Sequence, residues 1–239
     1  MAGRRAQLAE NLARVEERIS AACAAAGRAR EGVTLIVVTK TYPASDVRLL
    51  HELGVRHVAE NRDQDAAPKA AACADLDLTW HFVGQLQTNK VRSVASYAHV
   101  VHSVDRLKLV TALSDAAVRA GRELGCLIQV ALDAESGERG RRGGVSPEGI
   151  EELADAVGAA PGLRLDGLMT VAPLTGSYAG RQRAAFDRLM EFSSRLRAAH
   201  PAANMVSAGM SADLEDAVAA GATHVRIGTA VLGVRPRLG

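Results

Sequence analysis

The alternation of apolar runs with amphipathic stretches limits the possible folds of this chain more than any other feature. Short apolar runs typical of buried strands occupy Val33–Thr39, Val55–Ala59, Thr79–Gly84, His99–His102, Cys126–Leu132, Leu163–Met169, Asn204–Ser207 and His224–Ile227. Helical patterns lie between them at Ser45–Leu53, Arg62–Ala74, Thr88–Ser96, Arg106–Ala120, Pro147–Val157, Gly180–Ala199 and Ser211–Ala220. Such alternation predicts a parallel sheet. At 239 residues, a single α/β (β/α)8 TIM-type barrel is the economical fold, with a doubly wound open sheet as the alternative.

An amphipathic segment precedes the first predicted strand. Its apolar residues recur every three or four positions, at Leu8, Leu12, Val15, Ile19 and Cys23. This spacing predicts an extra helix over residues 1–27, ending near Gly27. We expect it to pack on a barrel formed by residues 33–233, so that residues 1–239 form one domain. The expected state is a monomer, with a weak dimer through this helix as the alternative.

The composition argues against several classes of protein. The 29 basic and 27 acidic residues leave a net charge of +2, which provides no electrostatic basis for nucleic-acid or membrane binding. Cys23, Cys73 and Cys126 lack the spacing of a metal site or a disulfide framework. No apolar run approaches the roughly 20 residues of a membrane span, and the N-terminus resembles neither a signal nor a transit peptide. We therefore expect a cytoplasmic protein without a bound metal.

Two predicted strand ends have the features of an anion site. In eight-stranded barrels, phosphate often binds after strands seven and eight, at the C-terminal face. Here the seventh strand continues through Ser207–Ser211, and the eighth is followed by Gly228 and Thr229. Small residues, hydroxyls and backbone N–H groups before a helix favour anion binding. The alternatives are that Ser211 only caps a helix beginning at Ala212 and that Gly228-Thr229 is an ordinary turn.

A lysine follows the first predicted strand. Lys40 comes directly after the apolar run Leu35–Val38 and Thr39. A lysine at the end of a buried strand is costly unless it is paired or chemically used, and a desolvated amine is a nucleophile toward carbonyls. The alternative is that the aliphatic part of the Lys40 side chain lies on apolar surface while its amine reaches solvent at the barrel mouth. Barrel closure places strand one beside strand eight, so a Schiff-base amine beside a phosphate site would suit pyridoxal 5'-phosphate (PLP) or a phosphorylated sugar aldehyde.

Arg226 bears on the choice between these two ligands. It lies two residues before Gly228 and therefore points the same way, into the barrel. The ring nitrogen of PLP needs a protein partner, and arginine can serve as a permanent donor. For a phosphosugar, Arg226 would be a second phosphate ligand. A buried salt bridge with Glu60 is the structural alternative.

Seven segments carry a resemblance to a known family. They are Val38–Pro43, Glu60-Asn61, Trp80–Lys90, His102–Asp105, Gly167–Thr170, Ser207–Ser211 and Val225–Ala230. In this order they resemble the pyridoxal-phosphate homeostasis proteins, whose barrel is related to the N-terminal domain of alanine racemase. The resemblance extends from the first helix to about Gly233.

The resemblance implies a PLP site made of six residues. Lys40 would carry the cofactor as an internal aldimine, and Arg226 would face the ring nitrogen. The phosphate would be held by Ser207, Gly228 and Thr229. Asn61 would lie near the ring.

Several other residues have less specific interpretations. His81 and Met169 are interpreted as barrel-core residues, with a place in the pocket wall as the alternative. Tyr42 stands where many relatives have a second lysine, so a relay through that lysine is not expected. The Arg/Gly-rich loop Glu138–Gly144 contains Arg139, Arg141 and Arg142. A solvated loop is favoured there over a lid or a docking patch.

The resemblance implies a PLP buffer and carrier that delivers the cofactor to apo-enzymes, without a complete catalytic apparatus. Racemisation needs a second acid/base group, which the resemblance to alanine racemase identifies as a tyrosine assisted by a C-terminal β-domain. The chain ends at Gly239, so we expect no such domain. None of Tyr42, Tyr97 and Tyr178 lies in a motif for this role, although Tyr42 is nearest to Lys40. A weak PLP-dependent amino-acid racemase and a lysine-dependent aldolase are the alternatives.

Overall fold

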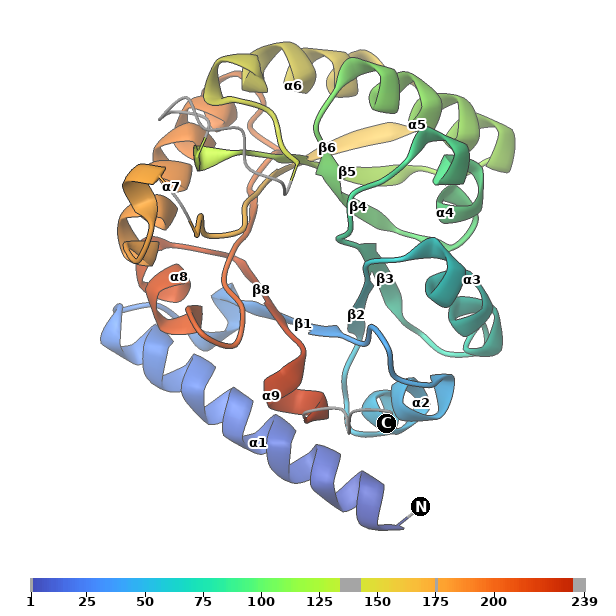
Figure 1. The fold of residues 1–239 in the computed structure, drawn as a ribbon, viewed down its shortest axis with the longest axis vertical. Helices are drawn as coiled ribbons and strands as arrows, with labels where there is room; N and C mark the ends of the chain where they lie inside the picture. The colour runs from blue at the N-terminus through green and yellow to red at the C-terminus, as the bar shows by residue number, and fades with distance from the viewer. Residues whose placement is uncertain (1, 134–142, 175, 234–239) are drawn as a thin grey trace.

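The chain folds into a closed barrel of eight parallel strands (Figure 1). The computed structural model describes residues 2–133, 143–174 and 176–233. The strands are β1 Thr34–Val38, β2 His57–Glu60, β3 Thr79–Phe82, β4 Val100–Val104, β5 Leu124–Gln129, β6 Leu163–Met169, β7 Met205–Ser207 and β8 His224–Ile227. β1 pairs with β8 and closes the sheet. The predicted (β/α)8 barrel is therefore confirmed, and the open sheet is excluded.

Helices surround the barrel and connect successive strands (Figure 1). The α-helices are α1 Ala2–Ala25, α2 Ala44–Glu52, α3 Asp63–Ala72, α4 Val91–Tyr97, α5 Leu107–Ala120, α6 Ile150–Ala159, α7 Gln182–Ala199, α8 Leu214–Ala220 and α9 Thr229–Leu232. Short 3-10 turns are η1 Arg30–Gly32, η2 Thr88–Lys90, η4 Pro147–Gly149 and η5 Gly176–Tyr178. Within the described ranges, no helix combines the length and apolar character that a bilayer span requires.

The start of α8 differs from the sequence prediction. The helix begins at Leu214 with Asp213 as its N-cap residue, so the N-cap role considered for Ser211 is wrong. The Asp213 Oδ1 atom accepts a hydrogen bond of 2.6 Å from the Met210 backbone N–H. This contact forms a local turn before the helix and delays the first helical residue.

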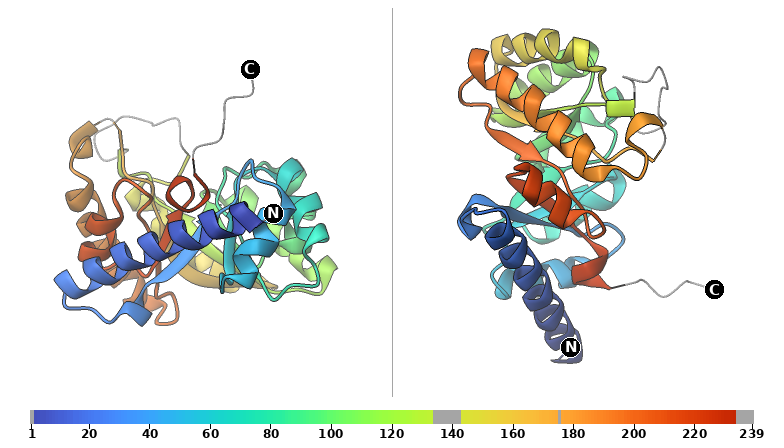
Figure 2. Two further views of the ribbon diagram at one scale, coloured as in Figure 1. Left: turned by 90° about the horizontal axis from the view of Figure 1, so that it is seen from below. Right: turned by 90° about the vertical axis from the view of Figure 1, so that its left-hand side faces the viewer.

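α1 lies along the outside of the barrel, next to β1, β8 and α8 (Figure 2). Its apolar face packs into one buried cluster, which includes Leu8 and Ile19 of α1 and Val225 and Ile227 of β8. The Asn11 side-chain amide also donates to the Val231 carbonyl of α9 at 2.8 Å. The predicted packing of the first helix on the barrel is therefore confirmed.

The barrel interior combines an aliphatic layer with polar side chains. The aliphatic residues Ile36, Ala59, Val100, Leu127, Met169 and Met205 form a cluster of their own. Met169 is thus a core residue, as the sequence indicated. Buried polar residues on the strands include His81, His102, Ser207 and Arg226. Buried polar groups need hydrogen-bond partners, so their contacts are informative.

Gly167 makes a close approach of two strands possible, and its substitution is expected to destabilise the barrel. Its φ is 149°, and an added Cβ would lie 1.9 Å from the carbonyl oxygen of Met205 on β7. We expect Gly167→Ala to lower the free energy of unfolding by about 3 kcal/mol, because the paired strands must move apart. Urea unfolding monitored by circular dichroism measures this change.

Gly158→Ala is the matched control for that variant. Gly158 is an exposed residue of α6, and the nearest atom to its added Cβ is 3.7 Å away. Alanine favours helix, so the control is expected to be neutral or more stable by up to about 1 kcal/mol. Equal destabilisation of both variants would contradict the strand-packing explanation.

Candidate functional site

The candidate site lies where β1 and β8 end side by side. The strands pair from Thr34 opposite His224 to Val37 opposite Ile227. A Cβ added at Gly228 would lie 3.3 Å from the carbonyl oxygen of Val38, two residues before Lys40. The structure therefore brings the lysine segment next to the Gly228-Thr229 loop, as barrel closure predicted. α9 begins at Thr229, and the first turn of a helix presents N–H groups without intrahelical acceptors.

Lys40 occupies a turn at the C-terminal rim. Its side chain is exposed, so the predicted cost of burying this lysine does not arise. The next residue, Thr41, has φ 69° and is the one non-glycine residue with positive φ in the described ranges. Such a backbone is strained by about 1–3 kcal/mol and is found preferentially at functional sites. The lysine is thus accessible at a turn with an unusual backbone.

A buried ion pair joins the ends of β1 and β2, and sequence reasoning missed it. The ammonium group of Lys69 on α3 is hydrogen-bonded to Glu60 Oε1 and donates to the Thr39 carbonyl at 2.9 Å. The Thr39 hydroxyl donates to the same Glu60 oxygen at 2.6 Å. Thr39 precedes Lys40 and Glu60 precedes Asn61. The cluster therefore holds in place the backbone from which these two candidate site residues extend.

Arg226 is held inside the barrel without a carboxylate partner. Its guanidinium donates to Ser207 Oγ at 2.6 Å and to the Thr170 carbonyl at 2.9 Å. The proposed salt bridge to Glu60 is wrong, because Glu60 is paired with Lys69. Within the described ranges, no ion pair involves Arg226. Burial lowers the Arg226 pKa to about 10, although the charge of Asp213 opposes this shift.

The guanidinium of Arg226 has spare hydrogen-bonding capacity. Arginine has more N–H donors than the two bonds to Ser207 and Thr170 use. Only 4% of the residue is exposed, and a buried cation without an anion is costly. This environment suits a ligand that presents an acceptor, such as a ring nitrogen or an anionic oxygen.

Ser207 contacts Arg226, a contact that the sequence analysis did not predict. Its hydroxyl accepts from Arg226 and also lies 3.0 Å from His102 Nδ1. The residue is fully buried, at the last position of β7. Its predicted contact with a phosphate remains a prediction, whereas its contact with Arg226 is a feature of the structure.

Asn61 lies at the neighbouring rim, after β2. Its backbone is packed so tightly against Gly84 that an added Cβ there would lie 2.0 Å from the Asn61 carbonyl oxygen. Asn61 also lines a cavity of about 290 Å³ with Gln85 and Lys90. The glycine of the Trp80–Lys90 segment therefore has a steric role in placing Asn61.

The described end of the Arg/Gly-rich loop reaches the same rim. The Gly144 N–H donates to Asp105 Oδ2 at 3.4 Å, and the Gln129 amide donates to the Gly143 carbonyl at 3.2 Å. Residues 134–142 lie outside the described residues, and with them Arg139, Arg141 and Arg142. The solvated-loop interpretation of these arginines stays a prediction.

Tyr42 has a structural role on the outside of the barrel. Its hydroxyl donates to the Gly233 carbonyl at 2.6 Å, and the Arg4 guanidinium lies 5.5 Å from the ring centroid. The Tyr97 hydroxyl lies 3.4 Å from Asp63 Oδ1, and burial raises its pKa. Neither tyrosine is arranged as a proton donor beside Lys40.

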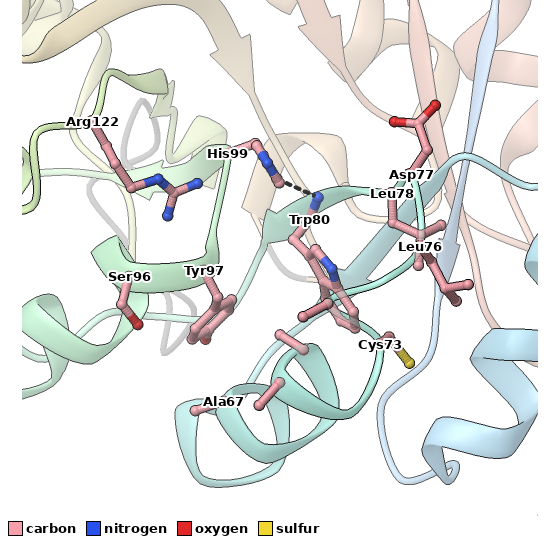
Figure 3. A pocket seen from close by; sticks show the side chains of 13 residues that line it. Ala67, Cys73, Leu76, Asp77, Leu78, Trp80, Ser96, Tyr97, His99 and Arg122 are labelled. Carbon is pink, nitrogen blue, oxygen red and sulfur yellow. Dashed lines mark hydrogen bonds between the residues drawn. The ribbon is translucent and has the colours of Figure 1, made fainter.

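A second cavity lies at the other end of the barrel. It has a volume of about 480 Å³ and is lined by residues that include Trp80, Tyr97, His99 and Arg122 (Figure 3). The Trp80 backbone N–H donates to His99 Nδ1 at 2.9 Å. His99 and Arg122 precede β4 and β5, so this cavity is at the N-terminal side and contains none of the predicted site residues.

The lysine content of the chain narrows the choice of a reactive amine. The sequence contains four lysines, at positions 40, 69, 90 and 108. Lys69 is buried in the ion pair with Glu60. Lys108 is exposed on the first turn of α5, in the outer helical ring, and Lys90 lines the cavity beside Asn61. Lys40 alone follows a strand that pairs with β8.

Histidines buried in the barrel make an acid-dependent loss of stability predictable. Burial is the main cause that lowers the pKa of His81 and His102 well below the ordinary 6.5, and it lowers that of His224 to about 4. Below pH 6.5 the unfolded chain therefore binds protons that the folded chain does not. Their contribution to stability is complete above pH 6.5 and is lost as the pH falls, by about 1.4 kcal/mol per histidine for each pH unit.

Urea unfolding at pH 7.5 and pH 5.5 measures this loss. Three such histidines are expected to lower the free energy of unfolding by roughly 4 kcal/mol at pH 5.5. His224→Gln is expected to show a smaller difference between the two pH values, because one titrating group is removed. Equal unfolding free energies of the wild type at both pH values would contradict this prediction.

Comparison with known proteins identifies the family. The model of the alanine racemase N-terminal domain matches residues 6–236. A pyridoxal phosphate homeostasis protein of Pseudomonas aeruginosa is 44% identical over 228 residues, which cover 95% of this chain and 96% of that protein. A protein of the same name from Mycobacterium tuberculosis is 42% identical over 248 residues, covering 97% and 94% of the two chains.

Solved structures agree with this relationship. PipY of Synechococcus elongatus with PLP bound has a TM-score of 0.77 and 33% identity, covering 95% of this chain and 100% of PipY. Alanine racemase of Clostridium difficile shares the fold, with a TM-score of 0.70 at 16% identity over 97% of this chain and 58% of the racemase. The chain belongs to the pyridoxal phosphate homeostasis proteins, within the broader alanine racemase N-terminal domain family.

Proposed function

We propose that this protein binds PLP through an imine bond between Lys40 and the cofactor aldehyde, buffers its free concentration in the cytoplasm and delivers it to apo-enzymes. The observation that carries the proposal is that Lys40 is exposed and follows, by two residues, the Val38 backbone that packs against Gly228. Two relatives support it: PipY has a structure with PLP bound, and the Pseudomonas protein is named for PLP homeostasis.

The described residues fit such a ligand. Arg226 is a buried donor with unused N–H groups, which suits the ring nitrogen as acceptor. Gly228 is the N-cap residue of α9 and Thr229 is its first residue. Backbone N–H groups at such a position favour a phosphate. Asn61 would lie at the ring edge, beside β2. When bound, PLP supplies a reactive aldehyde and an electron-withdrawing ring.

The protein's own residues favour retention over turnover. An arginine that is charged at neutral pH would leave the ring nitrogen unprotonated, which weakens electron withdrawal. A racemase also needs a second acid/base group on the opposite face of its substrate. Tyr42, the tyrosine nearest to Lys40 in sequence, instead donates its hydroxyl to Gly233. We therefore propose a carrier, and the weak racemase remains the second candidate.

A titration with three readouts tests this function. PLP is added to the purified protein while absorption is recorded, and the loaded protein is then mixed with an apo PLP-dependent enzyme. We expect an imine absorption band and recovery of the apo-enzyme's activity. L-alanine incubated with the loaded protein should keep its optical rotation. Absence of the band would contradict PLP binding, and a steady loss of rotation would favour the racemase.

A further inference from the structure

The cavity beside Trp80, at the N-terminal side of the barrel, has a wall of short and apolar side chains (Figure 3). Its volume of about 480 Å³ is typical of sites for small molecules. The wall consists of alanines of α3 together with Leu76, Leu78 and Trp80. Because the alanine side chains are short, they leave open space over this face of α3. The wall therefore suits the apolar body of a ligand.

Trp80 adds an aromatic surface and a hydrogen-bond donor to this wall. The residue is 4% exposed, and its indole meets the Tyr97 ring nearly at a right angle, with ring centroids 6.5 Å apart. A buried indole N–H usually has a hydrogen-bond acceptor. Among the residues that the structure describes, none accepts from the Trp80 indole N–H. A donor left without a protein acceptor beside a cavity suits a ligand that presents an acceptor.

His99 offers a second donor, and the structure decides which ring nitrogen carries the proton. The Trp80 backbone N–H donates to His99 Nδ1 at 2.9 Å. Since a backbone N–H can only donate, Nδ1 is the unprotonated nitrogen, and the neutral ring has its proton on Nε2. Burial, and then the charge of Arg122, lowers the His99 pKa, so the neutral ring prevails at pH 7. Its Nε2–H is accessible, because His99 is an exposed residue.

Arg122 brings a positive charge to the same part of the cavity. Its guanidinium donates to the Ala95 carbonyl of α4 at 2.8 Å, a bond that uses only one of its N–H donors. No carboxylate pairs with Arg122 in the described part of the chain. Figure 3 shows Arg122 and His99 on the same side of the Trp80 indole. A half-buried guanidinium with free N–H donors favours a carboxylate, which it can bind through two parallel hydrogen bonds.

Asp77 limits the charge that a ligand can carry. It lines the cavity and is exposed, and Figure 3 shows it on the other side of Trp80 from Arg122. Like charges brought close together are unfavourable. A second negative group at the far end of the ligand would approach Asp77, so one negative charge fits this cavity better than two.

We propose that this cavity is a second ligand site, which binds a small aromatic monocarboxylate. The carboxylate accepts from the guanidinium of Arg122 and from His99 Nε2–H, while the ring lies against Trp80 and the alanines of α3. The site is independent of the proposed PLP site, because it lies at the opposite side of the barrel and contains none of the residues predicted to hold PLP.

Fluorescence of Trp80 tests the proposal, since this is the only tryptophan of the chain. The full-length protein is titrated with phenylacetate, which combines a ring with one carboxylate, and with phenylacetamide, its neutral counterpart. Saturation-transfer NMR of the probes records binding in the same samples. For phenylacetate we expect saturable binding with a dissociation constant on the order of 1 mM, and at least tenfold weaker binding of the amide. No saturable binding of phenylacetate by either method, or equal affinity for both probes, would overturn the proposal.

Two arginine variants locate the carboxylate. Arg122→Met is expected to weaken phenylacetate binding at least tenfold. Arg119→Met is the matched control, because Arg119 is exposed in the last turn of α5 and does not line the cavity. It removes the same charge and should leave the affinity unchanged. Equal affinities of both folded variants and the wild type would place the carboxylate elsewhere and overturn the site.

Two further variants test the wall and the independence from PLP. Ala71→Leu extends an exposed side chain of α3 into the cavity. Leucine is a good helix former, so the protein should fold normally and bind phenylacetate several-fold more weakly. Lys40→Ala should bind phenylacetate like the wild type, whatever its effect on PLP. Wild-type affinity in Ala71→Leu, or loss of phenylacetate binding in Lys40→Ala, would contradict a separate site in this cavity.

Discussion

Lys40→Ala is expected to abolish the imine absorption band and the adduct that borohydride fixes covalently. The reason is chemical, since alanine has no amine to react with the cofactor aldehyde. Lys40 follows β1, which pairs with the strand that carries Arg226, and its side chain is exposed to an incoming ligand. Because the side chain is exposed, the variant should fold with the stability of the wild type. Absorption spectra before and after borohydride reduction measure the loss.

Two further lysine variants are the controls for that experiment. Lys90→Ala removes an amine that lines the cavity beside Asn61, and Lys108→Ala removes one from the outer surface of α5. Both variants should keep the band and the covalent adduct. If Lys90→Ala loses them while Lys40→Ala keeps them, the assignment of the reactive lysine is wrong.

Lys69→Met is expected to lower the free energy of unfolding by about 3–5 kcal/mol, because it leaves a buried carboxylate without its partner. Glu60 is 1% exposed, and its Oε1 atom is the common acceptor for Lys69 and Thr39. Its other oxygen is buried without a hydrogen bond in the described structure. Loss of the ammonium group should also loosen the ends of β1 and β2 that lead to Lys40 and Asn61.

An exposed ion pair provides the matched control for Lys69. Arg48 pairs with Asp75 at 2.6 Å, and both side chains are largely exposed. Arg48→Met is expected to cost at most about 1 kcal/mol, because exposed pairs contribute little. The double variant Lys69→Met/Glu60→Leu should recover much of the lost stability, since it removes the buried charge as well. Urea unfolding of the wild type, the two single variants and the double variant measures these changes. A decrease in the free energy of unfolding below about 1 kcal/mol for Lys69→Met would contradict the predicted cost of the unpaired carboxylate.

The sequence predicted the strands and helices well, but it predicted poorly which side chains of neighbouring elements contact one another. Leu163–Met169 and His224–Ile227 were predicted with the bounds that the structure has. Turn residues help to mark their starts, since Pro161-Gly162 directly precedes the first of these strands and Gly221 lies shortly before the second. Arg226 was wrongly considered as the partner of Glu60. The true partner, Lys69, lies on α3, whose alanine-rich sequence does not show which helix face packs against the barrel.

The contact between the imidazoles of His57 and His81, 3.0 Å apart at Nδ1 and Nε2, could not be predicted from the sequence either. His81 could be predicted to face the core, but its neighbours depend on the stagger of the strands. In the sheet His57 is level with Thr79, and His81 is level with Ala59. The contact between the two imidazoles is therefore diagonal. A pattern along each strand gives the inward face, whereas the register between strands decides which inward residues meet.

The most direct test of the central claim is to locate the covalent adduct in the wild-type protein. The protein is loaded with PLP, reduced with borohydride, digested and analysed by peptide mass spectrometry. We predict one modified lysine, and that the mass of the reduced cofactor lies on the peptide that contains Lys40. An adduct on Lys90 or Lys108 in place of Lys40, or a reduced protein without any adduct, would contradict the account.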